Sequence, residues 1–133
     1  MTTHTFAPGF RLSAVDVVVL IAGTIASIAL ATMTWWWGLA VGFVLGHFFL
    51  FCNVFRMARP LELAWAAVFV VLAGGTITHE TPGWMATFGI SVITTICVIA
   101  IELRKPSYHG IGWQRINPNL PQWWDAHVAQ TAR

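Results

Sequence analysis

The hydrophobic pattern of the chain is a series of long apolar stretches separated by short polar steps. Residues 12–55 are almost continuously apolar, about twice the roughly 20 residues that one membrane-spanning helix needs. This stretch therefore has to fold back once. The predicted reversal is the polar step Thr32-Met33-Thr34, which Trp35-Trp36-Trp37 follows, because tryptophan favours the membrane–water boundary. The pattern predicts one span over about 13–32 and a second over about 35–55.

Two further apolar stretches follow, each bounded by polar or helix-breaking residues. The segment Arg56-Met57-Ala58-Arg59-Pro60 ends the second span, since proline has no N–H and disfavours helix in the residue before it. The third span is predicted over about 61–78. The polar turn His79-Glu80-Thr81-Pro82-Gly83 separates it from a fourth span over about 84–103. The predicted fold class is an all-α polytopic membrane protein, a four-transmembrane-helix bundle that forms one domain over 1–103.

The composition agrees with a membrane protein. Charged residues make up 9% of the chain and apolar residues 57%, whereas a soluble domain carries about a quarter charged residues. Lipid covers the flanks of a membrane protein, so few surface charges are needed. The first apolar stretch has an alternative interpretation, because Arg11, the apolar run and Ala29-Leu30-Ala31 also resemble the three parts of a signal peptide.

Lysine and arginine predict the orientation, since they are retained on the cytoplasmic side of a membrane. In a four-span arrangement all seven basic residues fall on one side: Arg11, Arg56, Arg59, Arg104, Lys105, Arg115 and Arg133. We therefore expect a multi-pass protein with both termini cytoplasmic, in a bacterial cytoplasmic (inner) membrane. These residues form no basic run of the kind that binds nucleic acid, so no nucleic-acid partner is predicted.

Small residues on the first two spans predict close helix packing. Glycines recur at four-residue spacing in the second span, which lets another helix approach, and an amide falls on the same face at about 100° per residue. The surface is either ordinary bundle packing or a pore or assembly seam. The predicted helix-packing residues are Gly38, Gly42, Gly46, Asn53, Gly23 and Ser27.

His47 is the candidate cofactor-binding residue. It points roughly 140° away from the glycine face, and a polar ring near mid-membrane should not face lipid unpaired. It either donates a hydrogen bond to a neighbouring helix or binds haem, quinone or (bacterio)chlorophyll. His79 should differ from it in depth by on the order of 10 Å, so a second axial ligand would come from another chain. We expect one face of the second span to meet its own bundle and the other a ligand or a second chain.

The tail over 104–133 is rich in tryptophan and proline and is predicted to lie on the cytoplasmic side. A short helix is expected over about 121–130, with Asn119 as its cap. Trp113, Trp123 and Trp124 suit an interface with the membrane surface or with a partner. The two cysteines make no disulfide framework. Neither metal-ligand spacing nor a nucleophile–base pair is visible, so no catalytic or metal residue is predicted.

These observations predict a non-catalytic integral membrane scaffold or accessory subunit of a larger complex. An energy-transducing assembly, respiratory or photosynthetic, is the expected setting, with lipids and other integral subunits as partners. One alternative is an electron-transfer anchor that uses His47. The other is a small channel or transporter, whose path would follow the polar side of the fourth span: Thr87, Ser91, Thr94, Thr95 and Glu102.

Overall fold

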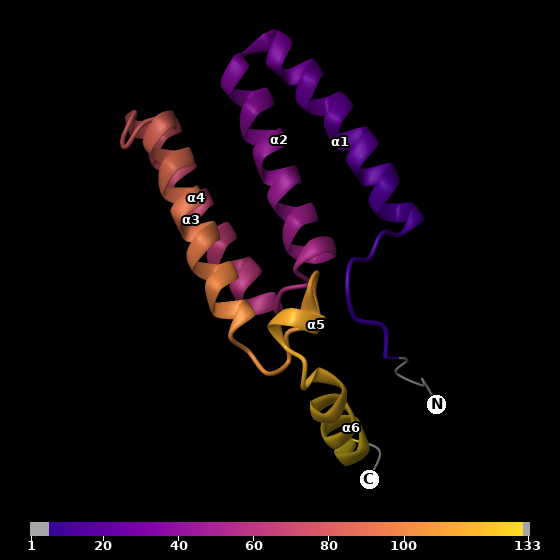
Figure 1. The fold of residues 1–133 in the computed structure, drawn as a ribbon. Helices are drawn as coiled ribbons and strands as arrows, with labels where there is room; N and C mark the ends of the chain where they lie inside the picture. Colours follow the sequence, from indigo (N-terminus) through magenta and orange to yellow (C-terminus); the bar gives the residue numbers. More distant parts are fainter. Residues whose placement is uncertain (1–5, 132–133) are drawn as a thin grey trace.

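The computed structural model describes residues 6–131, and every regular element in that range is a helix (Figure 1). The elements are α1 (Ala14–Met33), α2 (Trp35–Phe49), the π-helix η1 (Leu50–Val54), α3 (Arg59–His79), α4 (Trp84–Leu103), α5 (Trp113–Ile116) and α6 (Leu120–Thr131). Four segments are long and apolar enough to cross a membrane: α1, α2 with η1, α3 and α4. The predicted all-α fold with four apolar spans is confirmed, and each observed boundary lies within two residues of the predicted one.

Local sequence explains where the first spans begin and end. Ser13 and Asp16 form a reciprocal cap at the start of α1. The Asp16 amide donates to Ser13 Oγ at 3.2 Å, and the Ser13 amide donates to the Asp16 carboxylate at 2.7 Å. Thr34 is the one extended residue between α1 and α2, with φ −152° and ψ 123°, so the reversal lies where it was predicted. Pro60 occupies the first turn of α3, where its missing N–H is not needed.

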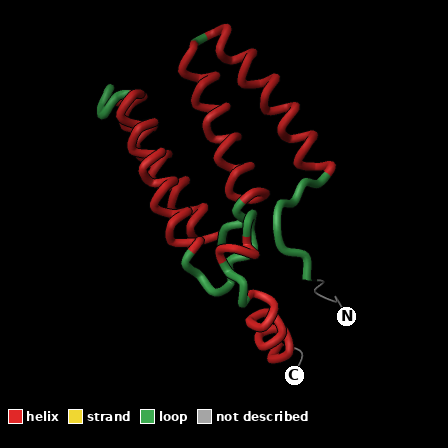
Figure 2. Tube along the Cα trace, in the orientation of Figure 1, coloured by secondary structure: helices red, strands yellow, loops and turns green. Residues whose placement is uncertain are grey.

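The four spans form two helical hairpins (Figures 1 and 2). In Figure 1, the α1–α2 turn and the α3–α4 turn lie toward one end of the bundle. The N-terminal segment, the loop between η1 and α3, and the tail with α5 and α6 gather at the other end (Figure 2). We call this end the base. An even number of spans therefore places both ends of the described chain on the same side.

Hydrogen bonds between buried polar groups join α3 to α4. Trp65 Nε1 donates to Thr95 Oγ1 at 2.8 Å, and the hydroxyls of Thr76 and Thr87 lie 2.9 Å apart. The Ser91 hydroxyl donates back to the Thr87 carbonyl at 2.7 Å. A buried polar group is costly unless it is paired, and this part of the polar side of α4 is paired. It serves helix packing, so we do not propose it as a solute path.

An aromatic cluster joins the two hairpins. The ring of Phe43 in α2 lies 5.7 Å from that of Phe69 in α3 and 4.9 Å from that of Phe88 in α4. Nearer the turns, Trp36 stacks on Trp84 with ring centroids 4.6 Å apart. Aromatic pairs at these separations stabilise a contact beyond the area that they bury. The cluster therefore fixes how one hairpin sits on the other.

Candidate functional site

His47 lies inside the aromatic cluster between the hairpins. Its ring stacks on Trp65 of α3, with centroids 4.6 Å apart and planes 14° apart, and the Phe43 ring is 4.2 Å away. His47 Nδ1 is 2.8 Å from the Phe43 carbonyl oxygen. Because a carbonyl only accepts, Nδ1 carries the proton and Nε2 is left as an acceptor. This hydrogen bond lies within α2 and not to a neighbouring helix, while α3 of the same chain packs on the ring of His47.

Nε2 is the atom of His47 that could bind a cofactor. The structure gives it no hydrogen-bond partner among residues 6–131. His79, the other histidine considered, is the last residue of α3 and lies at the turn end of its helix. In the same described range, no three His, Cys, Asp or Glu side chains are grouped to hold a metal ion. The cofactor role of His47 stays a prediction.

The small residues of the first two spans form the contact between α1 and α2. Gly38 lies against Ser27 and Ala31 of α1, and the Ser27 hydroxyl donates to the Gly38 carbonyl at 2.6 Å. A Cβ on Gly42 would lie 2.9 Å from Ser27 Oγ. In α1, a Cβ on Gly23 would lie 2.6 Å from Leu45 Cδ2. This surface is a packing contact within one hairpin, where the absence of side chains allows close approach.

Gly46 does not belong to this contact, although the four-residue spacing grouped it with Gly38 and Gly42. It is exposed, and a Cβ at this position would have no described atom within 4 Å. Asn53 is buried, and its side chain interacts with Asp16 in the first turn of α1, away from the glycine contact. Its side-chain amide donates to the Arg11 carbonyl in the N-terminal segment at 2.8 Å. Asn53 lies in the π-helix η1, whose wider turn changes the angular position of every residue in it.

The predicted tail tryptophans contact the N-terminal segment. The ring of Phe6 lies 5.8 Å from that of Trp113 and 5.5 Å from that of Trp124, both edge to face. Trp123 stacks on His127 within α6 at 4.1 Å. All three tryptophans are half-buried. The tail therefore docks on its own chain with two of them, and its role toward a membrane surface or a partner stays a prediction.

Sequence reasoning missed a hydrogen-bond network within the tail. Tyr108 is fully buried, and its hydroxyl donates to the Ile111 carbonyl at 2.7 Å. Asn117 donates to the Pro106 and Tyr108 carbonyls at 2.7 and 3.1 Å. Burial, and then the nearby Glu102 carboxylate, raise the pKa of Tyr108. The sequence signal was weak, because Tyr108 is an isolated polar aromatic in a segment without periodicity.

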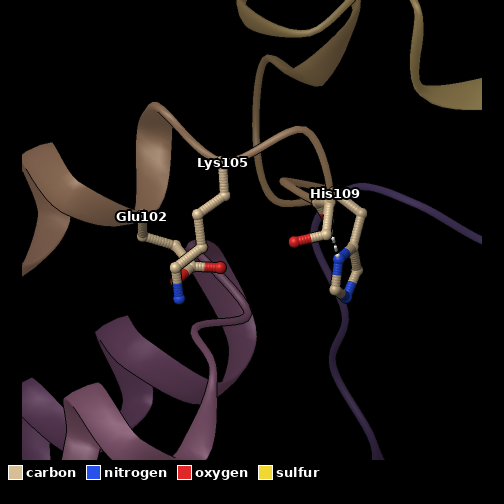
Figure 3. Close-up of polar contacts among 4 residues, drawn as sticks. Glu102, Lys105 and His109 are labelled. Atoms are coloured by element: carbon tan, nitrogen blue, oxygen red, sulfur yellow. Dashed lines mark hydrogen bonds and ion pairs between the residues drawn. The ribbon is translucent and has the colours of Figure 1, made fainter. Parts of the chain in front are cut away.

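Glu102 and Lys105 form an ion pair where α4 ends (Figure 3). Their Nζ and Oε2 atoms are 2.9 Å apart, and the Glu102 side chain is only 3% exposed. Oε2 meets this ammonium but makes no hydrogen bond of good angle. His109 lies apart from the pair, and its Nδ1 donates to the Ser107 carbonyl at 2.9 Å. The pair neutralises a carboxylate that would otherwise be buried with its charge unbalanced.

A basic cavity of about 510 Å³ lies at the base. It is lined by Ala7, Pro8, Phe10, Arg11, Arg56, His109 and Trp124. Three backbone hydrogen bonds hold its walls together. Gly9 N donates to His109 O at 2.7 Å, Arg11 N donates to Asn53 O at 3.1 Å, and Ile111 N donates to Val54 O at 2.9 Å. Segments from both ends of the sequence therefore build one cavity, which no single motif could have indicated.

The fold places the protein in the class of multi-pass helical membrane proteins, with a polar base where both ends of the described chain meet. No protein-family model matches the chain, and neither a curated protein nor a solved structure does. The functional interpretation therefore comes from the residues and their geometry.

Proposed function

We propose that the protein is a non-catalytic scaffold or accessory subunit of a larger membrane complex. The observation that carries this proposal is the exposure of α1. This helix contributes no buried residue. Its half-buried positions, such as Leu20, Gly23, Ser27 and Leu30, recur every three or four residues and form one stripe, the face toward α2. The rest of its circumference is open to lipid or to another chain.

The outward side of α1 suits a transmembrane helix of another subunit. Ala22 and Ala29 are exposed, and they lie roughly 130° around the helix from the stripe that faces α2. Transmembrane helices associate through van der Waals packing, and small residues allow close approach. The partner we propose is an integral subunit of an energy-transducing, respiratory or photosynthetic, assembly.

The distribution of charge supports a cytoplasmic position for the base in a bacterial inner membrane. In the described part of the chain, every lysine and arginine precedes α1, lies between η1 and the first residue of α3, or follows α4. The turns at the opposite end carry neither. Basic residues in short loops are retained on the cytoplasmic side, so we propose that both termini are cytoplasmic.

Site-specific photo-crosslinking in native membranes tests the partner. A photoreactive residue at Ala22 should give one discrete adduct. The same residue at Val71 is the control, because Val71 is a lipid-exposed apolar position on α3, 73% exposed. Ala22→Trp should also abolish co-purification of the crosslinked subunit, while Val71→Trp should not. Equal adducts at both positions, or co-purification that Ala22→Trp leaves intact, would contradict the proposal.

The second candidate is an electron-transfer anchor, and the free Nε2 of His47 favours it. Haem, quinone or (bacterio)chlorophyll are the cofactors to test. The experiment is an optical spectrum of the complex isolated from its native membrane. A cofactor band that His47→Ala shifts or removes would support ligation by His47. A band unchanged in position and intensity would exclude it.

A further inference from the structure

The two arginines of the basic cavity, Arg11 and Arg56, form no ion pair with a described acidic side chain. Within residues 6–131 the one ion pair joins Lys105 and Glu102. Asp16 attracts Arg11 electrostatically but forms no ion pair with it, and its carboxylate accepts hydrogen bonds from the Ser13 amide and hydroxyl, both at 2.7 Å. Arg56 donates from Nη1 to the Ala7 carbonyl. A carbonyl satisfies a donor but does not neutralise the charge.

Burial makes this excess of charge unfavourable. Arg56 is half-buried. Desolvation, and then the neighbouring Arg11, lower its pKa. Arg11 is exposed but lines the same cavity, and two like charges in one cavity repel each other. A counter-charge would stabilise the half-buried Arg56. An anion in the cavity would satisfy both arginines at once.

The depth of the cavity indicates which anion is available. Arg11 lies two residues before Ser13, the cap of α1, and Arg56 lies two residues after Val54, the end of η1. Both arginines therefore lie where membrane spans end. At this level the phosphate groups of lipids lie against the protein. Arginine holds phosphate well, because its planar donors match the phosphate oxygens.

An apolar groove borders the basic cavity. Its volume is about 590 Å³, and its lining includes Val19 and Leu20 of α1 together with Val41, Val44, Leu45 and Phe48 of α2. The hairpin explains the groove. Small residues hold the two helices close near the turn, and the helices diverge toward the base (Figure 1). Phe69 of α3 also lines the groove, so the groove lies between the α1–α2 hairpin and α3.

The cavity and the groove are direct neighbours. Arg11 lines the cavity and Asn53 lines the groove, and the Arg11 amide donates to the Asn53 carbonyl at 3.1 Å. The rings of Phe10 in the cavity and Phe49 in the groove lie 6.1 Å apart. A charged headgroup site therefore continues into an apolar channel of the kind that accepts an acyl chain.

We propose that this composite site binds one anionic phospholipid, with its phosphate on Arg11 and Arg56 and one acyl chain in the groove. Ala22 and Ala29, which are proposed for the partner contact, do not line the groove. The lipid site does not depend on that proposal. The lipid would connect the N-terminal segment, the η1–α3 loop and the α1–α2 hairpin at one point.

Native mass spectrometry of the full chain in mild detergent tests the lipid. The probes are phosphatidylglycerol and phosphatidylcholine with the same acyl chains. Wild-type protein should retain one phosphatidylglycerol, with roughly thirty-fold tighter binding than phosphatidylcholine if each arginine contributes as a surface basic residue does. Equal retention of the two lipids by the wild-type protein would overturn the proposal.

Substitutions of the two arginines test whether they bind the lipid headgroup. Arg11→Gln with Arg56→Gln should reduce phosphatidylglycerol binding to the phosphatidylcholine level, whereas the double lysine variant should keep a preference. Arg115→Gln is the matched control, because Arg115 is exposed in α5 and does not line the cavity. Undiminished preference in the double glutamine variant would overturn the role of the arginines.

A separate variant assigns the acyl chain. Val41→Trp fills the groove and should weaken the binding of both lipids by the same factor. Val71→Trp, on the lipid-facing side of α3, should weaken the binding of neither. Inorganic phosphate is the probe for a free anion, and at equal concentration it should leave the bound phosphatidylglycerol in place. If phosphate displaces all of the bound phosphatidylglycerol and Val41→Trp has no effect on lipid binding, the cavity binds a soluble anion. That result would overturn the proposal that it binds a lipid.

Discussion

Replacing Gly38 with alanine probes the close contact between α1 and α2. The new Cβ would lie 2.5 Å from the Ser27 carbonyl oxygen and 2.7 Å from Ala31 Cα, and it would also meet Ala31 Cβ. Most of these atoms are backbone, so no side chain can turn aside. The hairpin has to open by moving one helix away from the other. The same movement would lengthen the 2.6 Å hydrogen bond from Ser27 Oγ to the Gly38 carbonyl.

Gly46→Ala is the matched control for this substitution. It is the same change on the same helix, at a site where the Cβ meets nothing within 4 Å. The difference in helix propensity between glycine and alanine therefore cancels between the two variants. What remains is overpacking, about 1–3 kcal/mol, and the weakened interhelical hydrogen bond, about 0.6 kcal/mol. We expect Gly38→Ala to be less stable than Gly46→Ala by about 2–4 kcal/mol.

The assay is reversible unfolding in mixed micelles, with helix content followed by circular dichroism as the denaturing detergent is increased. The free energy of unfolding is compared between the two alanine variants. A difference below about 1 kcal/mol would refute the reasoning, because even the lower limit for overpacking exceeds it. Destabilisation of both variants by the same amount would also refute it, since Gly46 would then lie in a contact that the structure does not contain.

Two further predictions use the same unfolding measurement. Thr76→Val leaves the buried Thr87 hydroxyl without its 2.9 Å partner. The substitution should lower the free energy of unfolding by about 1 kcal/mol. The Thr76→Val, Thr87→Val double variant should lose less than the sum of the losses in the two single variants. Additive losses would show that the two hydroxyls do not interact. Tyr108, the one tyrosine of the chain, has a folded-state pKa raised above 10.0 by burial and then by Glu102. Its contribution to stability is therefore complete below pH 10.0 and should be lost as the pH rises through the folded-state value. Phenolate absorbance should appear at higher pH in the folded protein than in the unfolded protein, and a folded protein that titrates at the unfolded pH would contradict the burial of Tyr108.

The spans could be predicted because a membrane restricts the backbone conformations that a chain can adopt. A backbone in lipid has to satisfy its own hydrogen bonds, so long apolar stretches become helices. Polar steps and prolines then mark the ends. This is why the reversal at Thr34 and the start of α3 near Pro60 were found from the pattern alone. The predicted third span differed most, since α3 already begins at Arg59 and extends to His79.

The neighbour of each helix face could not be predicted in the same way. An angular count gives the direction in which His47 points, but it does not say which helix lies there. Trp65 of α3 occupies that direction, and no periodicity within α2 encodes it. The π-helix η1 adds a second difficulty, because a count at 100° per residue no longer holds after Leu50. Asn53 was therefore placed on the glycine face, whereas it bonds the N-terminal segment.

The basic cavity was hidden for a related reason. Arg11 and Arg56 were recognised from the sequence as markers of orientation, and each was considered on its own. Their proximity depends on the N-terminal segment docking on the base through backbone hydrogen bonds, such as Gly9 N to His109 O. Such bonds leave no side-chain pattern in the sequence. A basic residue beside a span therefore has two separable roles, one in insertion and one in the finished fold.

These two roles place opposite demands on ion pairing. Orientation depends on lysine and arginine and little on acidic residues, so an ion pair does not by itself affect it. Phosphate binding does depend on ion pairing, because an arginine that is paired with a carboxylate has lost part of its attraction for another anion. In the described chain Lys105 is paired with Glu102, while the Arg56 guanidinium donates to the Ala7 carbonyl and neither Arg11 nor Arg56 forms an ion pair. The two arginines without an ion pair are those that line the cavity beside the apolar groove, where the phosphate of an anionic lipid can bind them.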